Sequence, residues 1–177
     1  MSVEMPESAL AVMLPDAESA LSRIRDGGLG QEDVVSPAHI TLLFPWMPPS
    51  RIDAAVLQEL RVTFGGFPPI DVTLELGWFG REVLLLVPDD PEPLVAMTSA
   101  VIARWPEFPY CGGDYDEIEP HLTLAYGDEG SLAPMADAVS ELLPLRVRAD
   151  AVSLVLGPAM SVKQEFSLGN LPSGVMQ

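Results

Sequence analysis

The chain has 177 residues, and 26 acidic against 9 basic residues give it a formal net charge of −17. Because affinity for nucleic acids depends largely on lysine and arginine, this balance argues against long RNA or DNA as a partner. A hydrophobic fraction of 48% excludes wholesale disorder, and the length predicts a single domain over residues 1–177.

The pattern of apolar residues predicts many short elements joined by turns rich in proline and glycine. Asp16 and Ser50 are the expected caps of the first two helices. This order of elements is typical of an α+β fold. In chain order the elements are a strand over 8–14, a helix over 17–25, a strand over 39–44, a helix ending near Thr63, a hairpin of strands 71–78 and 82–87, a helix over 91–105, a strand over 121–126, a helix over 132–142 and a closing antiparallel pair over 147–156 and 162–168.

The same sequence predicts a protein that works away from membranes. No apolar run approaches the length of a membrane span, and the first residues lack the positive charge of a signal peptide. The one cysteine, Cys111, has no partner for an internal disulfide. We therefore expect a cytoplasmic protein that acts as a monomer and has no membrane partner.

The two histidines of the chain open the same four-residue phrase, His-x-Thr-Leu, at His39 and at His121. At ordinary residue frequencies such a repetition arises by chance in roughly one chain in ten thousand or fewer. Both phrases lie in predicted strands, where residues two apart project from the same face. Each phrase therefore offers an imidazole and a hydroxyl, from Thr41 or Thr123, to one cavity.

Strict alternation also predicts which neighbours share that face. Leu43 and Ala125 fall on the face of the histidines, whereas Phe44 and Tyr126 fall on the opposite, packed face. A lone histidine in a strand is more often structural than catalytic, and threonine is simply a good strand former. Since that explanation has to hold twice for the same phrase, we expect a paired acid–base site and hence an enzyme.

The paired phrases, 82 residues apart, resemble those of the two-histidine (2H) phosphoesterase superfamily, which includes 2′-5′ RNA ligase-like proteins and 2′,3′-cyclic nucleotide phosphodiesterases. The resemblance implies a bilobal fold of two small antiparallel sheets related by pseudo-twofold symmetry, with helices on the outer faces and a central cleft. It also implies chemistry without metal or cofactor, in which a 2′,3′-cyclic phosphate opens to a 2′-phosphate.

The residues themselves suit this chemistry. Splitting a phosphodiester without metal needs a base for water, an acid for the leaving oxygen and donors for the phosphoryl oxygens. Two imidazoles can supply the base and the acid near neutral pH, and Thr41 and Thr123 can supply the donors. The sequence leaves the assignment of roles open; our working assignment makes His121 the base and His39 the acid.

Further residues are candidates for contact with substrate, although loop anchoring explains the two tyrosines at least as well, and core packing is the more conservative explanation for Trp46 and Phe79. Glu119, two positions before His121, could orient an imidazole through its carboxylate. Cations could bind phosphate, and aromatic rings could stack on a base or line the cleft. The candidates are Arg81, Lys163, Phe79, Trp46, Tyr110 and Tyr115.

Acidic residues after the second phrase, Asp128 and Glu129, argue against RNA processing and favour a small, nucleotide-like cyclic phosphate. Two distant histidines match no usual zinc pattern, no Gly-x-Ser-x-Gly elbow occurs, and phosphate-binding glycine motifs are absent. The prediction is thus a metal-independent phosphoesterase. The alternatives are a non-catalytic module that binds a nucleotide or a protein, and an RNA 2′-5′ ligase-like activity.

Overall fold

The computed structural model describes residues 7–26, 33–34, 37–157 and 160–170. Two short 3-10 helices, η1 (Pro49–Arg51) and η2 (Tyr110–Gly113), accompany four α-helices: α1 (Pro15–Asp26), α2 (Ala54–Gly65), α3 (Glu92–Arg104) and α4 (Glu129–Ser140). The strands are β1 (Ser8–Met13), β2 (Asp33–Val34), β3 (His39–Leu43), β4 (Ile70–Phe79), β5 (Val83–Pro88), β6 (Leu122–Tyr126), β7 (Leu145–Ala149), β8 (Ala151–Leu156) and β9 (Ser161–Ser167). The predicted α+β class is confirmed.

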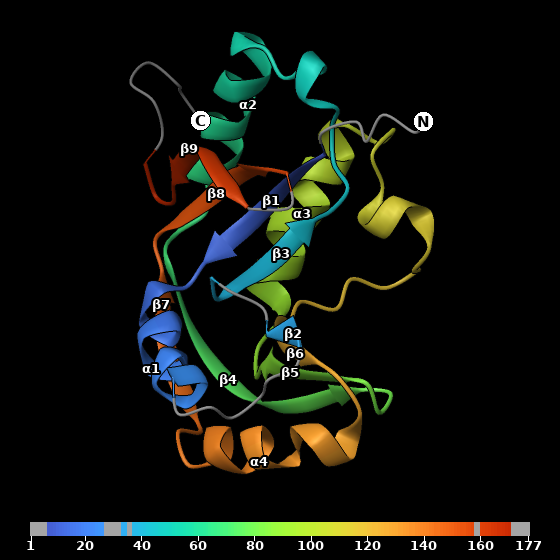
Figure 1. The fold of residues 1–177 in the computed structure, drawn as a ribbon. Helices are drawn as coiled ribbons and strands as arrows, with labels where there is room; N and C mark the ends of the chain where they lie inside the picture. Colours follow the sequence, from blue (N-terminus) through green and yellow to red (C-terminus); the bar gives the residue numbers. More distant parts are fainter. Residues whose placement is uncertain (1–6, 27–32, 35–36, 158–159, 171–177) are drawn as a thin grey trace.

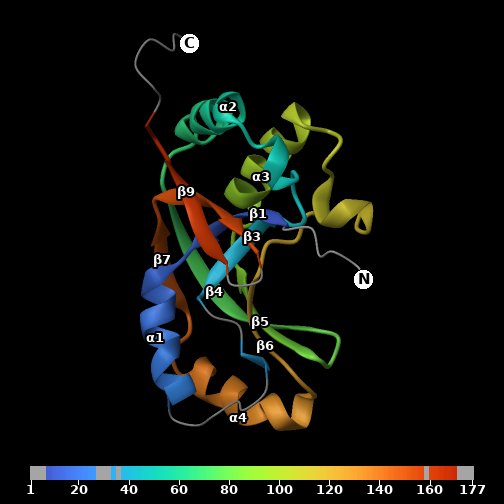
Figure 2. The ribbon, with the colours of Figure 1, turned by 45° about the horizontal axis from the view of Figure 1, so that its top comes forward.

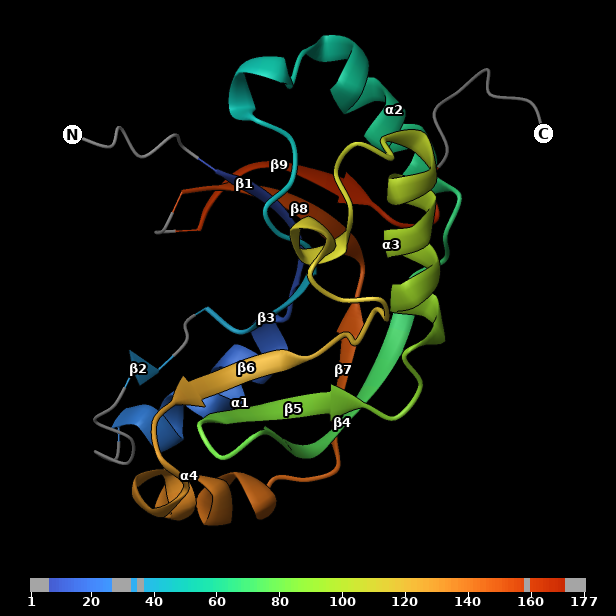
Figure 3. The same ribbon diagram turned by 90° about the vertical axis from the view of Figure 1, so that its right-hand side faces the viewer.

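The strands of the described residues form one antiparallel sheet in the order β7-β4-β5-β6-β3-β1-β8-β9, with β2 pairing with β6. The prediction of two separate sheets is therefore wrong. At the centre, β3 and β6 pair at one position, Ile40 opposite Leu122. This bridge joins the strands β7-β4-β5-β6, to which β2 is added at β6, to the strands β3-β1-β8-β9. The pseudo-twofold symmetry stays a prediction. Figure 3 looks onto the two central strands, which lie side by side.

The helices pack on the two halves in pairs (Figures 1 and 2). Helices α1 and α4 contact each other and the strands β4, β5 and β7, whereas α2 and α3 contact each other and the strands β3 and β9. Large side chains such as Phe64, Phe166 and Leu60 are fully buried between helices and sheet. None of the helices in the described part of the chain combines the length and hydropathy needed to cross a membrane.

The ends of one strand and the starts of two helices differ from those predicted from the sequence. The expected strand over 147–156 breaks at the exposed Asp150, a poor strand former, so that β7 pairs with β4 while β8 pairs with β1 and β9. Helix α2 is capped by Asp53, whose Oδ1 accepts a hydrogen bond from the Val56 N–H at 2.9 Å, because Ser50 lies in η1. Helix α4 starts at Glu129, three residues before the predicted start at residue 132, because Asp128 caps it.

Candidate active site

The central junction of the sheet brings the two His-x-Thr-Leu phrases together. Ile40 and Leu122, which pair there, are 0% and 1% exposed and point into the core, so their neighbours project from the other, open face. In an antiparallel pair those neighbours also lie opposite each other, with Cβ atoms about 4.5–5.5 Å apart. Four half-buried side chains therefore form one cluster, which we call the quartet: His39 across from Thr123, and Thr41 across from His121.

A β-bulge follows the threonine of each phrase, and the leucine of the phrase is the extra residue. In β3 the register to β1 shifts so that Ala11 faces Thr41 but Leu10 faces Leu43. In β6 the register to β5 shifts in the same way between Thr123 and Ala125. Leu42 and Leu124 are 1% and 5% exposed, so each bulge is anchored by an apolar side chain in the core.

The bulges reverse the predicted alternation at the ends of both strands. Leu43 and Ala125 are each 0% exposed, so the prediction that they share the histidine face is wrong. The aromatic residues that follow them, Phe44 and Tyr126, turn outward and are about half exposed. A single extra residue shifts the side-chain period by one position, and every later residue changes face.

Both imidazoles are held by the backbone in the same way. Nδ1 of His39 lies 2.7 Å from the carbonyl oxygen of Pro37, and Nδ1 of His121 lies 2.8 Å from that of Glu119. Because a carbonyl oxygen can only accept, Nδ1 carries the proton and donates it in each case. The neutral form of each ring then leaves Nε2 unprotonated and free to act as a base.

The two rings differ in their surroundings. Burial lowers the pKa of His39, the hydrogen bond to Pro37 raises it, and the nearby charge of His121 lowers it again; the net direction is downward. A lowered pKa means that His39 is neutral over a wider range around pH 7 than a free imidazole.

Each anchoring segment is itself fixed by other residues. The Ala38 N–H, next to His39, donates to Oε2 of Glu18 at 2.7 Å, and the Ala38 carbonyl accepts from the Leu14 N–H at 3.0 Å. On the other side, the hydroxyl of Tyr110 donates to the Glu119 carbonyl at 3.5 Å, a long bond to the same oxygen that anchors His121. Burial raises the pKa of Tyr110, so its hydroxyl keeps the proton that it donates.

These contacts change two sequence interpretations. Tyr110 was a candidate for contact with substrate, and the structure directs its hydroxyl to the backbone behind His121 instead. Glu119 orients an imidazole, but its carbonyl makes the contact where the carboxylate was expected. Sequence reasoning missed Glu18 altogether, because nothing in its surroundings in α1 signals a partner 20 positions away.

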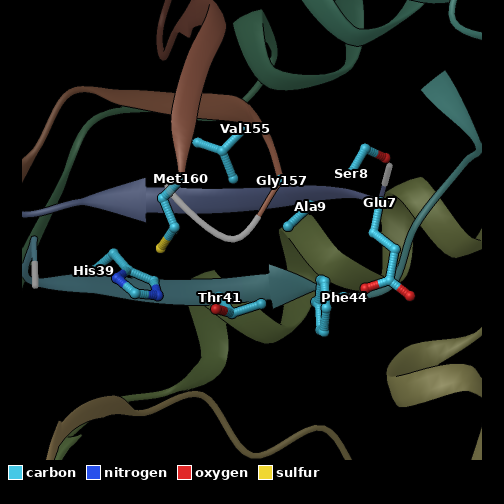
Figure 4. Close-up of a pocket in the computed structure, with 9 residues that line it drawn as sticks. All are labelled: Glu7, Ser8, Ala9, His39, Thr41, Phe44, Val155, Gly157 and Met160. Carbon is cyan, nitrogen blue, oxygen red and sulfur yellow. The ribbon is translucent and has the colours of Figure 1, made fainter. Parts of the chain in front are cut away.

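A pocket of about 210 Å³ opens beside the first half of the quartet (Figure 4). His39 and Thr41 project into it from the same side of β3, and Phe44 lies at the end of that strand. Its described lining contains no lysine or arginine and consists of Glu7, Ser8, Ala9, His39, Thr41, Phe44, Val155, Gly157 and Met160. His121 and Thr123 lie across the strand junction from this pocket.

The remaining sequence candidates fall into two groups. Trp46 is 4% exposed and packs edge-on against Trp105 at 5.5 Å between ring centres, so it belongs to the core and is not available to a substrate. The second group comprises Phe79 and Tyr115, whose side chains are exposed to solvent by 57% and 55% and so do not belong to the core.

Neither cationic candidate contacts the quartet. Arg81 lies in the β4–β5 turn and makes a loose ion pair of 3.9 Å with Glu129. Lys163 is exposed on the edge strand β9. Within the described residues, no group of three or more His, Cys, Asp or Glu side chains is placed to hold a metal ion.

A known protein family matches most of the chain. A model of the 2′-5′ RNA ligase superfamily matches residues 14–157, a span that contains both phrases. The chain belongs to the 2′-5′ RNA ligase superfamily. The resemblance to two-histidine phosphoesterases is thereby confirmed. No curated protein matches the chain.

Solved structures share the fold at low sequence identity. The protein TT0787 of Thermus thermophilus is 19% identical with a TM-score of 0.65, covering 93% of this chain and 98% of its own. E. coli LigT complexed with 3′-AMP is 13% identical with a TM-score of 0.58, covering 93% and 99%. Kluyveromyces marxianus Usb1 is 13% identical with a TM-score of 0.51, also covering 93% and 99%. At these identities the likeness establishes the fold of the chain.

Proposed function

We propose that this chain is a metal-independent phosphoesterase that hydrolyses a small cyclic phosphodiester of the 2′,3′-cyclic nucleotide type. The observation that supports the proposal is the strand register at the sheet junction. This register puts His39 opposite Thr123 and Thr41 opposite His121 on one open face of the sheet. Membership of the superfamily supports the same reaction class.

In the proposed reaction, Nε2 of His39 takes a proton from a water whose oxygen attacks phosphorus. The bond from phosphorus to one ring oxygen of the cyclic phosphate breaks, and His121 gives its proton to that oxygen. Hydroxyls of Thr41 and Thr123 donate to the non-bridging oxygens. The partial burial of His39 favours it as the neutral base, which reverses our working assignment from sequence. The product is a phosphomonoester, and the two histidines exchange one proton overall.

The size and charge of the surroundings favour a small substrate. A pocket of about 210 Å³ beside His39 suits a nucleoside-sized group better than a polymer, and a net charge of −17 repels long polyanions. Structures of LigT have been solved in complex with 3′-AMP, NADP+ and ATP, all of them small nucleotides. A substrate of this class is our proposal for the present chain.

The direct test is an assay of 2′,3′-cyclic nucleotides with the purified protein, followed by ³¹P NMR. We expect conversion to a single phosphomonoester at an unchanged rate in excess EDTA, because no step of the proposed reaction uses a metal. Tight binding without conversion would instead identify a binding module. Loss of conversion in EDTA, with recovery on adding a divalent cation, would refute the metal-independent reaction.

Glu18 offers a separate test of how His39 is held. Replacing Glu18 with alanine removes the acceptor of the Ala38 N–H, and we expect kcat to fall by roughly tenfold with little change in KM, because small misplacements of a catalytic group are costly. Glu18→Gln keeps an acceptor oxygen and should restore most of the rate. The matched control is Ser19→Ala on the exposed side of the same helix. Equal activity of Glu18→Ala and wild type would show that Glu18 does not help to position His39.

A further inference from the structure

The pocket beside His39 contains one ionisable group that the proposed reaction does not use, the carboxylate of Glu7. Figure 4 shows His39 at one end of the pocket and Glu7 at the other, with Thr41 between them. Within the described part of the chain, the Glu7 carboxylate has neither a hydrogen-bond nor an ion-pair partner. Both of its oxygens are therefore available to accept hydrogen bonds from a ligand.

The backbone at Glu7 is fixed, although the side chain is exposed. The Glu7 carbonyl accepts a hydrogen bond from the Gly157 N–H at 3.0 Å, which extends the pairing of β1 with β8 by one residue. The next residue, Ser8, is buried: its carbonyl accepts from the Trp46 N–H at 2.9 Å, and its hydroxyl donates to the Met47 carbonyl at 2.6 Å. Glu7 thus presents its carboxylate from a well-held position at the end of the pocket.

Strand geometry gives the distance from Glu7 to the phosphate site. Ala11 of β1 stands opposite Thr41, and Glu7 comes four residues before Ala11, or about 13 Å along an extended chain. Figure 4 shows the Glu7 side chain extending from the start of β1 towards β3. This span suits a single nucleoside whose 2′ and 3′ oxygens carry the phosphate at the quartet and whose base reaches Glu7 with its far edge.

The lining between the two ends suits a neutral base. It is formed by the apolar side chains of Ala9, Val155 and Met160, and the described lining contains no lysine or arginine. Glu7 repels a second anionic group, whereas a base that presents N–H donors satisfies the carboxylate. Among the common RNA bases, guanine alone presents two adjacent donors, N1–H and the 2-amino group, on its Watson–Crick edge.

We propose that Glu7 selects the base of the substrate: its two carboxylate oxygens accept hydrogen bonds from N1–H and the 2-amino group of guanine, so that guanosine 2′,3′-cyclic phosphate is the preferred substrate. This inference rests on the phosphate site of the proposed function and names the substrate that fills it. The other bases place a ring nitrogen or a carbonyl oxygen, both acceptors, beside their donor. Two acceptors facing each other leave the carboxylate incompletely paired, which disfavours those bases.

The test measures binding of product nucleotides by calorimetry, so that it does not depend on turnover. The ligands are guanosine, inosine and adenosine 2′-phosphates; inosine differs from guanosine only by the missing 2-amino group. Glu7→Gln keeps the shape of the side chain and replaces one acceptor oxygen with an amide donor. The matched control is Glu141→Gln, which removes one exposed carboxylate at the end of α4, in the other half of the sheet.

Wild type should bind guanosine 2′-phosphate about tenfold or more tightly than adenosine 2′-phosphate, the discrimination typical of a bidentate contact, with inosine 2′-phosphate between them. Glu7→Gln should bind the guanosine ligand about tenfold more weakly and the adenosine ligand more tightly than wild type, because an amide matches the donor and acceptor of adenine. Glu141→Gln should bind all three ligands like wild type.

Equal affinity of wild type for the guanosine and adenosine ligands, or a guanosine preference that survives in Glu7→Gln, would overturn the inference. The two proposals fail separately. A protein that shows the predicted binding pattern but cleaves no cyclic nucleotide would refute the proposed hydrolysis and leave base selection by Glu7 standing. A protein that cleaves all 2′,3′-cyclic nucleotides with equal kcat/KM would refute base selection and leave the hydrolysis standing.

Discussion

Replacing either His39 or His121 with alanine is expected to lower kcat for a 2′,3′-cyclic nucleotide by about 10²- to 10⁴-fold, the range in which a positioned acid or base contributes. The reason is that the quartet has one imidazole for each proton transfer, and among the described residues no other titratable side chain is placed on it by the strand register. The measurement is the initial rate at saturating substrate for each variant.

The double variant and a surface control sharpen this prediction. Since the two histidines act in one transition state, removing both should cost little more than removing one. Glu119→Ala removes an exposed carboxylate beside His121 but keeps the carbonyl that anchors its ring, so it should retain activity within about twofold. Loss of activity in Glu119→Ala, or full activity in either single histidine variant, would contradict the assigned roles.

Thr41→Val and Thr123→Val are expected to give the next largest effects, lowering kcat by about 10²-fold each, as removal of a donor to a developing oxyanion does elsewhere. Valine keeps the shape and the strand preference of threonine, so the sheet should be preserved. Binding of the product phosphomonoester should weaken less than the rate falls, because the donors act most strongly on the transition state.

The matched control for the threonines is Thr73→Val. Thr73 is also a half-buried strand residue, but it lies in β4, two strands away from β6. It should leave kcat unchanged. A similar loss of rate in all three valine variants would indicate a general effect on the sheet. It would contradict the proposal that Thr41 and Thr123 donate hydrogen bonds to the phosphoryl oxygens.

The sequence predicted the elements and the face of the quartet because both follow from local periodicity. The alternation of His-x-Thr-Leu is visible in the chain, and the structure places the first three residues of each phrase as that alternation requires. The fourth residue departs from it: Leu42 and Leu124 read as ordinary strand positions, and their role as bulge residues depends on the register to β1 and β5. Register is set between strands and cannot be read from one strand alone.

Other features depended on contacts between distant segments. Trp46 follows the first histidine strand closely in sequence, but packing against Trp105 draws it into the core. The support of Ala38 by Glu18 arises only when α1 packs beside β3, and the single joined sheet arises only when β3 pairs with β6. Neither the aromatic character of a residue nor its position along the chain indicates such tertiary contacts. Trp46 therefore could not be distinguished from the other aromatic candidates on the basis of the sequence.

The claim that one phosphate lies between both imidazoles can be measured directly, because the chain contains only two histidines. Labelling with ¹⁵N-histidine gives two ring spin systems, which single substitutions assign. In the free protein both neutral rings should be protonated on Nδ1, and the pKa of His39 should lie below 6.5. Adding adenosine 2′-phosphate should shift both Nε2 resonances with one common dissociation constant. A shift of one ring alone, or two different dissociation constants, would contradict a shared phosphate site.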